Sequence, residues 1–354
     1  MGRYSGRMAD TSAPLQDRVT APAELPLPQH PDVATWRPAK RDDLDDIMTM
    51  LDAVRRADHP AWSVTRTEID DAMGSSMLDL ATDSLLALDE SGTVIAFGIA
   101  AIAQGQATRV QVYLDGAVHP DWRGRGIGRL LLAWQRDRSL QLLAASDKPL
   151  PGWSMLHEAE SNVPAQHLAE RAGFTLTRYF TQMVRRLDEP IEPIPAKADV
   201  QIVPLSADLI EATRVARNDA FRDHWGSQPM TVERWGHLTS SPEFRNDLSR
   251  VAVVPGEDGS RRVVAFALTS VNESDWDAAG YAKAYIEYVG VVRDHRGQRL
   301  APAVIAAALQ AHKSAGIERS ELDVDSDSPT GANTLYQSMG FSLGDRDLSY
   351  VLEV

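Results

Sequence analysis

Cysteine is missing from this chain of 354 residues. Its absence excludes disulfides, thiolate nucleophiles and zinc or iron–sulfur sites with cysteine ligands, so any chemistry must use other side chains. The nine histidines contain no His-x-x-x-His pair or comparable ligand cluster. We therefore expect no metal site.

Long apolar runs are also missing. No stretch approaches the roughly 20 apolar residues that cross a bilayer, and the N-terminus lacks the apolar core of a signal peptide. Acidic residues outnumber basic ones, because the chain has 50 aspartates and glutamates and 36 lysines and arginines. Its net charge is −14. Nucleic acid and anionic membranes would repel such a chain. We expect a cytoplasmic monomer or homodimer with a small-molecule substrate, and no nucleic-acid or membrane partner.

The length suits two domains, because roughly 100 to 200 residues usually make one. Hydrophobic residues make up 43 % of the chain and charged residues 24 %, which is typical of a folded globular protein. Residues 1–33 lack apolar periodicity and are expected to be a mobile tail, and the proline-rich segment 189–198 is expected to be a linker. The expected domains are 34–188 and 199–354.

The same order of elements is predicted twice. Each half has a short strand, a helix, a hairpin of two strands around a polar turn, and a further strand. The predicted strands are 35–38, 84–88, 93–100 and 109–118 in the first half, and 201–205, 251–254, 263–271 and 285–292 in the second. The offset is about 170 residues, which is too long for a solenoid repeat and indicates two copies of one α/β domain.

A glycine-rich, basic turn follows the last of these strands in the first half. The strand ends at Val118, and the segment His-Pro-Asp-Trp-Arg-Gly-Arg-Gly leads directly into an apolar helix. Glycines let the backbone approach a ligand, the helix start offers unpaired N–H groups, and arginines add positive charge, so the turn suits a diphosphate. The turn lacks the Gly-Lys-Ser/Thr ending of a Walker loop, and its glycines do not have the Gly-x-Gly-x-x-Gly spacing of a Rossmann dinucleotide-binding motif. A tight turn without a ligand is the alternative interpretation.

The turn resembles the acyl-CoA-binding signature of the GNAT superfamily of N-acetyltransferases, Arg/Gln-x-x-Gly-x-Gly/Ala. The second copy departs from it, because Arg299 stands at the first glycine position. Helices ending in Gly-Phe, at 173–174 and 340–341, extend the resemblance over about 34–186 and 199–354. It implies an α/β (α+β) class with two tandem GNAT-like domains, each a mixed, mostly antiparallel sheet flanked by helices.

The resemblance also implies acetyl-CoA as the acyl donor, held by the turn in each copy. The residues implied in the first copy are Val118, Arg123, Gly124, Arg125, Gly126, Ile127 and Gly128. Those implied in the second copy are Val291, Arg296, Gly297, Gln298, Arg299, Leu300 and Ala301.

Acetyl transfer to an amine needs an acid for the departing thiolate and an acceptor for the amine proton. Family members commonly carry a tyrosine acid on the helix before Gly-Phe, and Tyr336 fills that place, opposite Ala169 in the first copy. Packing within a buried helical stripe is the alternative role of Tyr336.

The resemblance implies a carboxylate base on the strand that enters the turn. Glu287 lies four residues before Val291, which by strand alternation puts both on one face, and Leu114 is the expected equivalent in the first copy. Asp115 would point to the opposite face. A solvent-facing strand residue is the alternative for Glu287.

Asp223, His224 and Trp225 lie where the superfamily usually forms its acceptor wall, and acidic and aromatic groups suit an amine substrate. An aromatic anchor between the domains is the alternative. We expect an acetyl-CoA-dependent N-acetyltransferase acting on a small primary amine by direct attack in a ternary complex, with catalysis in the second copy. A non-catalytic acyl-CoA sensor, catalysis in the first copy, and acetylation of a cysteinyl sugar conjugate are the alternatives.

Overall fold

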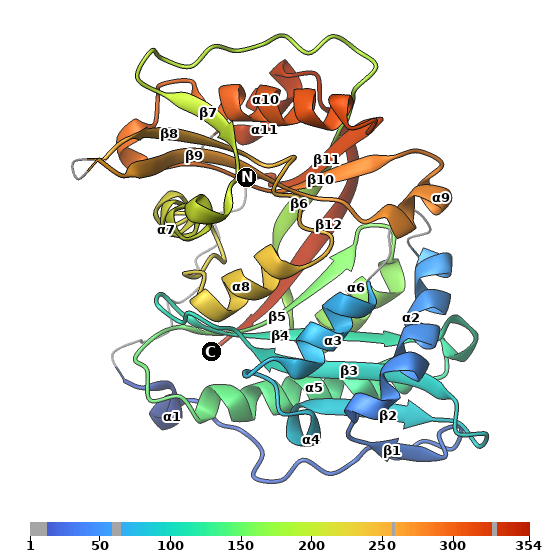
Figure 1. The fold of residues 1–354 in the computed structure, drawn as a ribbon. Coiled ribbons are helices and arrows are strands. Elements are labelled where there is room, and N and C mark those ends of the chain that lie inside the picture. Colours follow the sequence, from blue (N-terminus) through green and yellow to red (C-terminus); the bar gives the residue numbers. More distant parts are fainter. Residues whose placement is uncertain (1–12, 59–64, 257–258, 328–330) are drawn as a thin grey trace, which may run out of the picture. The chain divides into compact units, whose positions relative to one another are not determined.

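The computed structural model describes residues 13–58, 65–256, 259–327 and 331–354, which form two compact units (Figure 1). Unit 1 contains the described residues up to 178 together with 348–354, and unit 2 contains those of 179–347. The C-terminus thus joins unit 1, where Gly152 and Val354 exchange backbone hydrogen bonds of 3.0 and 2.8 Å. The limits 34–188 and 199–354 remain a prediction about the sequence repeat.

Unit 1 has the strand order β1-β2-β3-β4-β5, in which β4 and β5 pair in parallel and the other pairs are antiparallel. Its helices and strands are α1 (Leu15–Arg18), β1 (Thr35–Arg37), α2 (Leu44–Asp58), α3 (Arg66–Gly74), α4 (Leu80–Asp83), β2 (Ser84–Leu88), β3 (Val94–Ile102), β4 (Val110–Val118), α5 (Ile127–Ala144), β5 (Gly152–Ala159) and α6 (Val163–Arg171).

Unit 2 has the strand order β6-β11-β10-β9-β8-β7, in which only the β10–β11 pair is parallel. Its helices and strands are β6 (Thr175–Arg186, paired with β11 from residue 180), β7 (Gln201–Pro204), α7 (Ile210–Ala220), α8 (Val232–Ser240), β8 (Arg250–Pro255), β9 (Arg261–Ser270), α9 (Trp276–Ala279), β10 (Lys283–Val291), α10 (Leu300–Ser314), β11 (Arg319–Asp325), α11 (Ala332–Ser338) and β12 (Ser342–Glu353). The predicted fold class is confirmed in both units.

Local signals set several element boundaries. Thr65 opens α3 with a capping box, in which its hydroxyl accepts the Glu68 N–H at 3.1 Å and the Glu68 carboxylate accepts the Thr65 N–H at 2.7 Å. The predicted hairpin of β2 and β3 turns through Gly92, whose φ of 82° suits glycine. Both contacts depend only on neighbours in sequence, and of the two the hairpin was predicted from the sequence.

The strand registers show the duplication directly. Ala96 of β3 pairs with Val118, and Ala265 of β9 pairs with Val291. Counted back along β4 and β10 from the basic turns, the paired positions of the two ladders match one by one. The match ends where β10 carries an extra residue between Ile286 and Tyr288. That residue is Glu287, and β4 has no such bulge.

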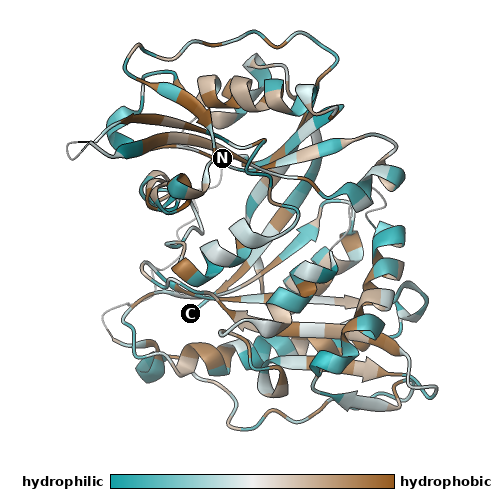
Figure 2. Cartoon of the chain, in the orientation of Figure 1, coloured by the Kyte–Doolittle hydropathy of each residue, from teal (hydrophilic) through white to brown (hydrophobic). Residues whose placement is uncertain are grey.

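Each sheet is covered by the helix that follows its basic turn. In unit 1, Ile127, Leu131 and Trp134 of α5 pack against Leu85 and Ile95. In unit 2, buried residues of α10 including Val304 join the core of β8 and β9. Figure 2 shows the apolar residues concentrated on these strands and along α10. Within the described ranges, no helix is both long and apolar enough to cross a membrane.

Residues 13–33 differ from the expected mobile tail. Leu15 is fully buried, and its backbone N–H bonds the Lys148 carbonyl at 3.0 Å. Farther along, the Gln141 amide of α5 donates to the Pro22 carbonyl at 2.9 Å, and Val33 is buried in the core. An extended segment held by α5 has no internal period, so periodicity could not reveal its packing.

Candidate active site

The basic turn of unit 1 joins β4 to α5. Gly124 and Gly126 have φ of 75° and 97°, in the left-handed region that glycine enters without steric cost. The first hydrogen bond of the helix runs from the Leu130 N–H to the Gly126 carbonyl, at 3.3 Å. The N–H groups of the first three helical residues, 127–129, therefore have no acceptor within the helix.

The turn of unit 2 has the same backbone conformation despite its arginine. Gly297 has a φ of 72°, and Arg299 has a φ of 60° as the N-cap of α10. Arg299 is the one non-glycine residue with a positive φ in the described part of the chain, and an L-residue there costs roughly 1–2 kcal/mol. The Ala303 N–H bonds the Arg299 carbonyl at 3.4 Å, as Leu130 bonds Gly126.

The arginine that opens each turn is held from two sides. In unit 1 the Arg123 Nε donates to the Val118 carbonyl at 3.1 Å, and both terminal nitrogens reach the Asp58 carboxylate at 2.7 Å. In unit 2 the Arg296 Nε lies 3.5 Å from the Val291 carbonyl, and Nη2 donates to the Ala220 carbonyl at 2.9 Å. Each guanidinium thus ties the turn to its entering strand and to the first long helix of the unit.

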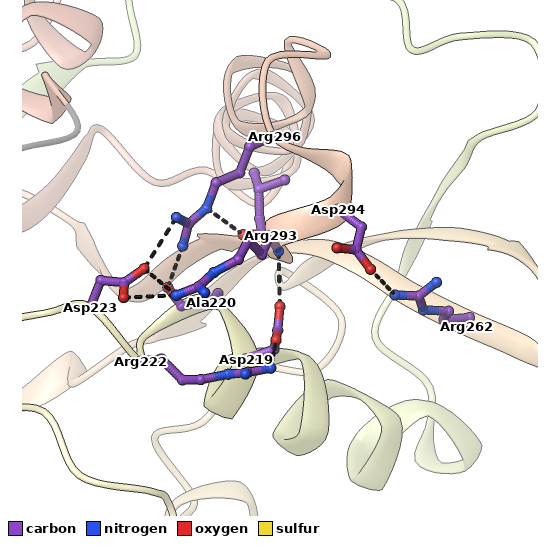
Figure 3. Close-up of polar contacts among 9 residues, drawn as sticks. Asp219, Ala220, Arg222, Asp223, Arg262, Arg293, Asp294 and Arg296 are labelled. Carbon is purple, nitrogen blue, oxygen red and sulfur yellow. Dashed lines mark hydrogen bonds and ion pairs between the residues drawn. The ribbon is translucent and has the colours of Figure 1, made fainter. Parts of the chain in front are cut away.

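Asp223 belongs to this framework of unit 2 (Figure 3). Both of its oxygens accept from Arg293 at 2.7 Å, and Arg296 lies 3.5 Å away. The hydrogen bond from Arg293 lowers the pKa of Asp223. Asp219 accepts the Arg293 backbone N–H at 2.8 Å and also pairs with Arg222. Asp223 is therefore engaged by the turn, in contrast with the expected contact to substrate.

Both turns fit a diphosphate. A Cβ built at Gly124 or Gly297 would meet no atom within 4 Å, so the backbone stands open to a ligand. The side chains of Ile127 and Leu300 are 1 % exposed and belong to the core, which leaves only their amides for a ligand. Unpaired N–H groups at a helix start bind anions. Among the described residues no group of acidic and histidine side chains could hold a metal ion.

Tyr336 lies at the end of α11 and is 8 % exposed. Phe341 packs edge-on against its ring at 5.6 Å. The Tyr336 hydroxyl has no hydrogen-bond partner within the described residues, and burial raises the pKa of Tyr336 to about 12. The Phe341 N–H bonds the Tyr336 carbonyl at 3.1 Å, as the Phe174 N–H bonds that of Ala169 at 3.0 Å. The helix endings therefore match residue for residue, as aligned from the sequence.

Glu287 is the extra residue of the β-bulge in β10. Ile286 pairs with Thr269 and Tyr288 with Leu268, so Glu287 has no pair of its own on β9. The bulge interrupts side-chain alternation between Glu287 and Val291, so counting back from Val291 does not assign a face to Glu287.

The equivalences in unit 1 change with the bulge. The matching ladder places Leu114 opposite Ala100, at the register position of Ile286. Asp115 takes the position of Tyr288, so Glu287 has no counterpart in unit 1, and Leu114 was the wrong equivalent. A bulge adds one residue without altering composition or pattern, which is why the sequence alone concealed it.

Comparison with known proteins gives these features a family. The acetyltransferase (GNAT) family model matches residues 210–341, and the model of an acetyltransferase (GNAT) domain matches residues 81–176. A mycothiol acetyltransferase from Streptomyces griseus subsp. griseus is 31 % identical over 242 residues, which are 67 % of this chain and 70 % of that relative. The chain belongs to the GNAT acetyltransferase family.

Further comparisons extend the match over most of the chain. A mycothiol acetyltransferase from Nocardiopsis dassonvillei is 27 % identical over 343 residues, 88 % of this chain and 96 % of that one. A GCN5-related N-acetyltransferase from Sphaerobacter thermophilus shares the fold with a TM-score of 0.66 at 24 % identity, over 92 % of this chain and 97 % of that chain. A tandem GNAT protein from the clavulanic acid biosynthesis pathway shares it with a TM-score of 0.64 at 16 % identity, over 90 % and 98 %.

Two GNAT domains in tandem confirm the predicted membership and the enzyme class, an acyl-CoA-dependent N-acetyltransferase. Acyl-CoA is accordingly the donor class of the family. The matched ranges each contain one basic turn. The roles of individual side chains remain predictions.

In unit 2 of this GNAT protein, His224 belongs to an aromatic group with Phe221 and Tyr288, and Trp225 lies beside Phe180. The His224 ring stacks on Phe221 at 4.5 Å, and burial lowers the pKa of His224. Trp225 lies 6.4 Å from Phe180. The Tyr288 ring meets Phe221 edge-on at 5.5 Å, so the register neighbour of Glu287 belongs to the same group.

Sequence reasoning missed a tyrosine–aspartate pair in this GNAT domain. The Tyr285 hydroxyl donates to Asp323 at 2.8 Å, across the parallel β10–β11 pair. Burial raises the pKa of Asp323 and raises that of Tyr285 well above its ordinary value. Tyr285 lies only two residues before Glu287 in the sequence, and that proximity is the signal that could have drawn attention to it.

Proposed function

We propose that the protein transfers the acetyl group of acetyl-CoA to a primary amine of a small molecule, and that unit 2 carries out the chemistry. The observation that carries the proposal is the difference between the units. Unit 2 has the inserted Glu287 and the Tyr336 hydroxyl, which has no partner among the residues that the structure describes, whereas unit 1 lacks the insertion and has Ala169.

In this proposal Glu287 accepts the proton of the attacking amine, directly or through water, and Tyr336 donates a proton to the thiolate that leaves. Acetyl-CoA supplies the activated acetyl thioester when it is bound. A tyrosine with a pKa of about 12 stays protonated at neutral pH, as a proton donor must. The acyl group passes directly to the amine, because the chain has no cysteine to carry it.

The amides of 297–301 hold the diphosphate of acetyl-CoA in unit 2, while Arg296, Arg293 and Asp223 keep the turn in place. Backbone donors aimed at an anion need no rearrangement when it binds. Unit 1 has an equally open turn and binds acyl-CoA without turnover. His224 and Trp225 line the amine site in this proposal, because the His224 ring belongs to the aromatic group that includes Tyr288 and Trp225 follows it directly in the chain.

The acceptor is the open part of the proposal. A cysteinyl sugar conjugate of the kind implied by the mycothiol acetyltransferases is one candidate amine. Overall identity near 30 % leaves other small amines equally eligible. The cytoplasmic location, the absence of a metal and a monomeric or homodimeric state remain predictions.

An acetylation screen tests the proposed function. The purified full chain is incubated with acetyl-CoA and pools of amino sugars, amino acids, polyamines and cysteinyl sugar conjugates. Free CoA thiol is recorded, and products are sought by mass spectrometry as additions of one acetyl group. Thiol release at background with every pool, together with measurable CoA binding, would favour the non-catalytic acyl-CoA sensor instead.

A further inference from the structure

A similar turn lies just before β1 in unit 1 and just before β7 in unit 2. In unit 1 the Val33 N–H bonds the His30 carbonyl at 3.1 Å, and in unit 2 the Val200 N–H bonds the Lys197 carbonyl at 3.0 Å. Both valines are 8 % exposed, so each closes its turn by entering the core. Lys197 therefore opens its turn in unit 2 as His30 does in unit 1.

In unit 1 this segment reaches the cofactor turn. The His30 Nε2 lies 2.8 Å from the Arg125 carbonyl, and its Nδ1 accepts the Asp32 backbone N–H at 3.1 Å. The Asp32 carboxylate lies 3.8 Å from Arg125. The His30 imidazole and the Asp32 carboxylate thus lie beside the basic turn of unit 1.

In unit 2 the corresponding segment borders an open hollow of about 380 Å³. Its walls include Pro193, Pro195 and Lys197 of the segment, and Gln298 and Arg299 of the cofactor turn. The volume lies within the roughly 300–1,000 Å³ of small-molecule pockets. In the described part of the chain, neither Lys197 nor Arg299 has an acidic partner.

The start of the segment 189–198, which lies before the residues that border the hollow, is also held by hydrogen bonds. Lys313, near the end of α10, lies 3.4 Å from the Glu189 carbonyl, and Arg185 donates to the Pro190 carbonyl at 2.7 Å. Figure 1 shows the chain running past α10 before it enters β7. With its start tied and its prolines restricting φ, the segment presents a semi-rigid wall to the hollow.

Lys197 and Arg299, which have no acidic partner among the described residues, lie beside the turn proposed to bind the diphosphate. Two such cations suit a further phosphate group of the same ligand, above all in a chain with a net charge of −14. Coenzyme A carries that group on the 3′ oxygen of its adenosine ribose. We propose that the hollow binds the 3′-phosphoadenosine end of acyl-CoA in unit 2, with Lys197 and Arg299 contacting the 3′-phosphate and the prolines packing against the base. The inference rests on the proposed use of acetyl-CoA.

The comparison of the two units also predicts that unit 1 binds the 3′-phosphate weakly. Asp32 places negative charge beside the basic turn of unit 1 and lies 3.8 Å from Arg125, whereas Lys197 and Arg299 of unit 2 have no acidic partner among the described residues. Selectivity for the 3′-phosphate should therefore belong to unit 2 and should depend on the inter-copy linker.

Calorimetric titration of the full chain with CoA and with 3′-dephospho-CoA tests the inference. We expect one class of sites to bind CoA about tenfold more tightly than 3′-dephospho-CoA, as a charge-assisted contact of this kind allows. Lys197→Met and Arg299→Gly should each reduce that ratio toward one while leaving the affinity for 3′-dephospho-CoA within about twofold. Lys40→Met, which removes an exposed lysine of unit 1, should keep the ratio.

The outcomes separate the two proposals. A ratio that is the same in the unaltered protein and in both variants overturns the 3′-phosphate site and leaves the acetyltransferase proposal standing. Failure of the unaltered protein to bind either ligand overturns both. Arg299→Gly supplies a foldable second variant, because glycine is at ease at the φ of 60° that Arg299 adopts.

Discussion

Arg299 holds, at a φ of 60°, the left-handed backbone position that Gly126 holds at 97° in the other unit. The two residues cap the equivalent helices α10 and α5, and each accepts that helix's first hydrogen bond through its carbonyl. Unit 2 therefore keeps the amide arrangement of the cofactor turn at the cost of an arginine in an unfavourable conformation, and gains a guanidinium at its edge.

This strain makes a stability prediction. Arg299→Gly should change the free energy of unfolding by less than about 1 kcal/mol, because relief of the left-handed strain offsets the greater freedom of glycine in the unfolded chain. Arg299→Val should cost about 2 kcal/mol or more, since β-branched residues are outliers at positive φ. Urea unfolding measures both, with Gln298→Val as the neighbouring control. Equal stability of the glycine and valine variants would contradict the strain.

Tyr336→Phe separates chemistry from packing. The ring and its contact with Phe341 remain, and the lost hydroxyl has no partner among the described residues, so unfolding should change by less than about 0.5 kcal/mol. Turnover should fall by about 100-fold or more through loss of the acid, with the Kd of acetyl-CoA unchanged. Unchanged turnover would assign Tyr336 to packing alone. Tyr281→Phe, which alters a hydroxyl bonded to Glu321, is the control.

Glu287→Gln removes the proposed base and keeps the size of the side chain. We expect kcat for acetyl transfer to fall by about 100-fold, with little change in acetyl-CoA affinity, because the carboxylate acts on the amine and not on the diphosphate. Glu273→Gln, on the exposed turn before α9, provides the matched control. An equal and small effect of both changes would return Glu287 to a purely structural place in the bulge.

Two glycines at equivalent positions distinguish the cofactor turns. Gly124→Asp and Gly297→Asp introduce the same carboxylate at φ of 75° and 72°, where neither new Cβ meets an atom within 4 Å. Repulsion of the diphosphate should remove one CoA site in each variant. Turnover should vanish only in Gly297→Asp, and the corresponding asparagine variants should retain binding. Loss of turnover in Gly124→Asp alone would place catalysis in unit 1.

Buried His312 predicts a pH dependence of stability. The ring is fully buried between the Ser320 hydroxyl at 2.6 Å and the Thr269 hydroxyl at 3.0 Å, and burial lowers its pKa to about 3. Unfolded histidine titrates near 6.5, so between pH 6.5 and 3 the unfolded chain binds the extra proton. This group should therefore remove up to about 1.4 kcal/mol of stability per pH unit as the pH falls through that range.

Unfolding titrations from pH 7 to 4 measure that slope. His312→Gln should flatten it, although the variant loses stability at pH 7 because its amide fits the two hydroxyls poorly. His167→Gln, an exposed histidine of α6, should leave the slope as it is. A slope unaltered by His312→Gln would show that other groups control acid unfolding.

Features carried by neighbouring residues were predictable. The hairpins, the strands that enter the basic turns and the Gly-Phe helix endings all depend on local hydrogen bonds and on alternation within a few residues. The alignment of Tyr336 with Ala169 is an example, because it follows from counting back from each Gly-Phe. The same counting failed at Glu287, where a single extra residue in β10 leaves the apolar pattern intact but moves every earlier position by one.

The sequence by itself determined that two α/β copies each carry a basic turn before a helix, because turn glycines and apolar periods are local properties. Only the tertiary structure decided that Asp223 holds Arg293 and Arg296, some 70 residues later in the chain. It also brought Lys197 to a hollow beside Arg299 and buried Leu15 against the far end of α5. Such contacts join segments without any shared period, so their energy comes from burial and charge pairing that exist only once the chain has folded.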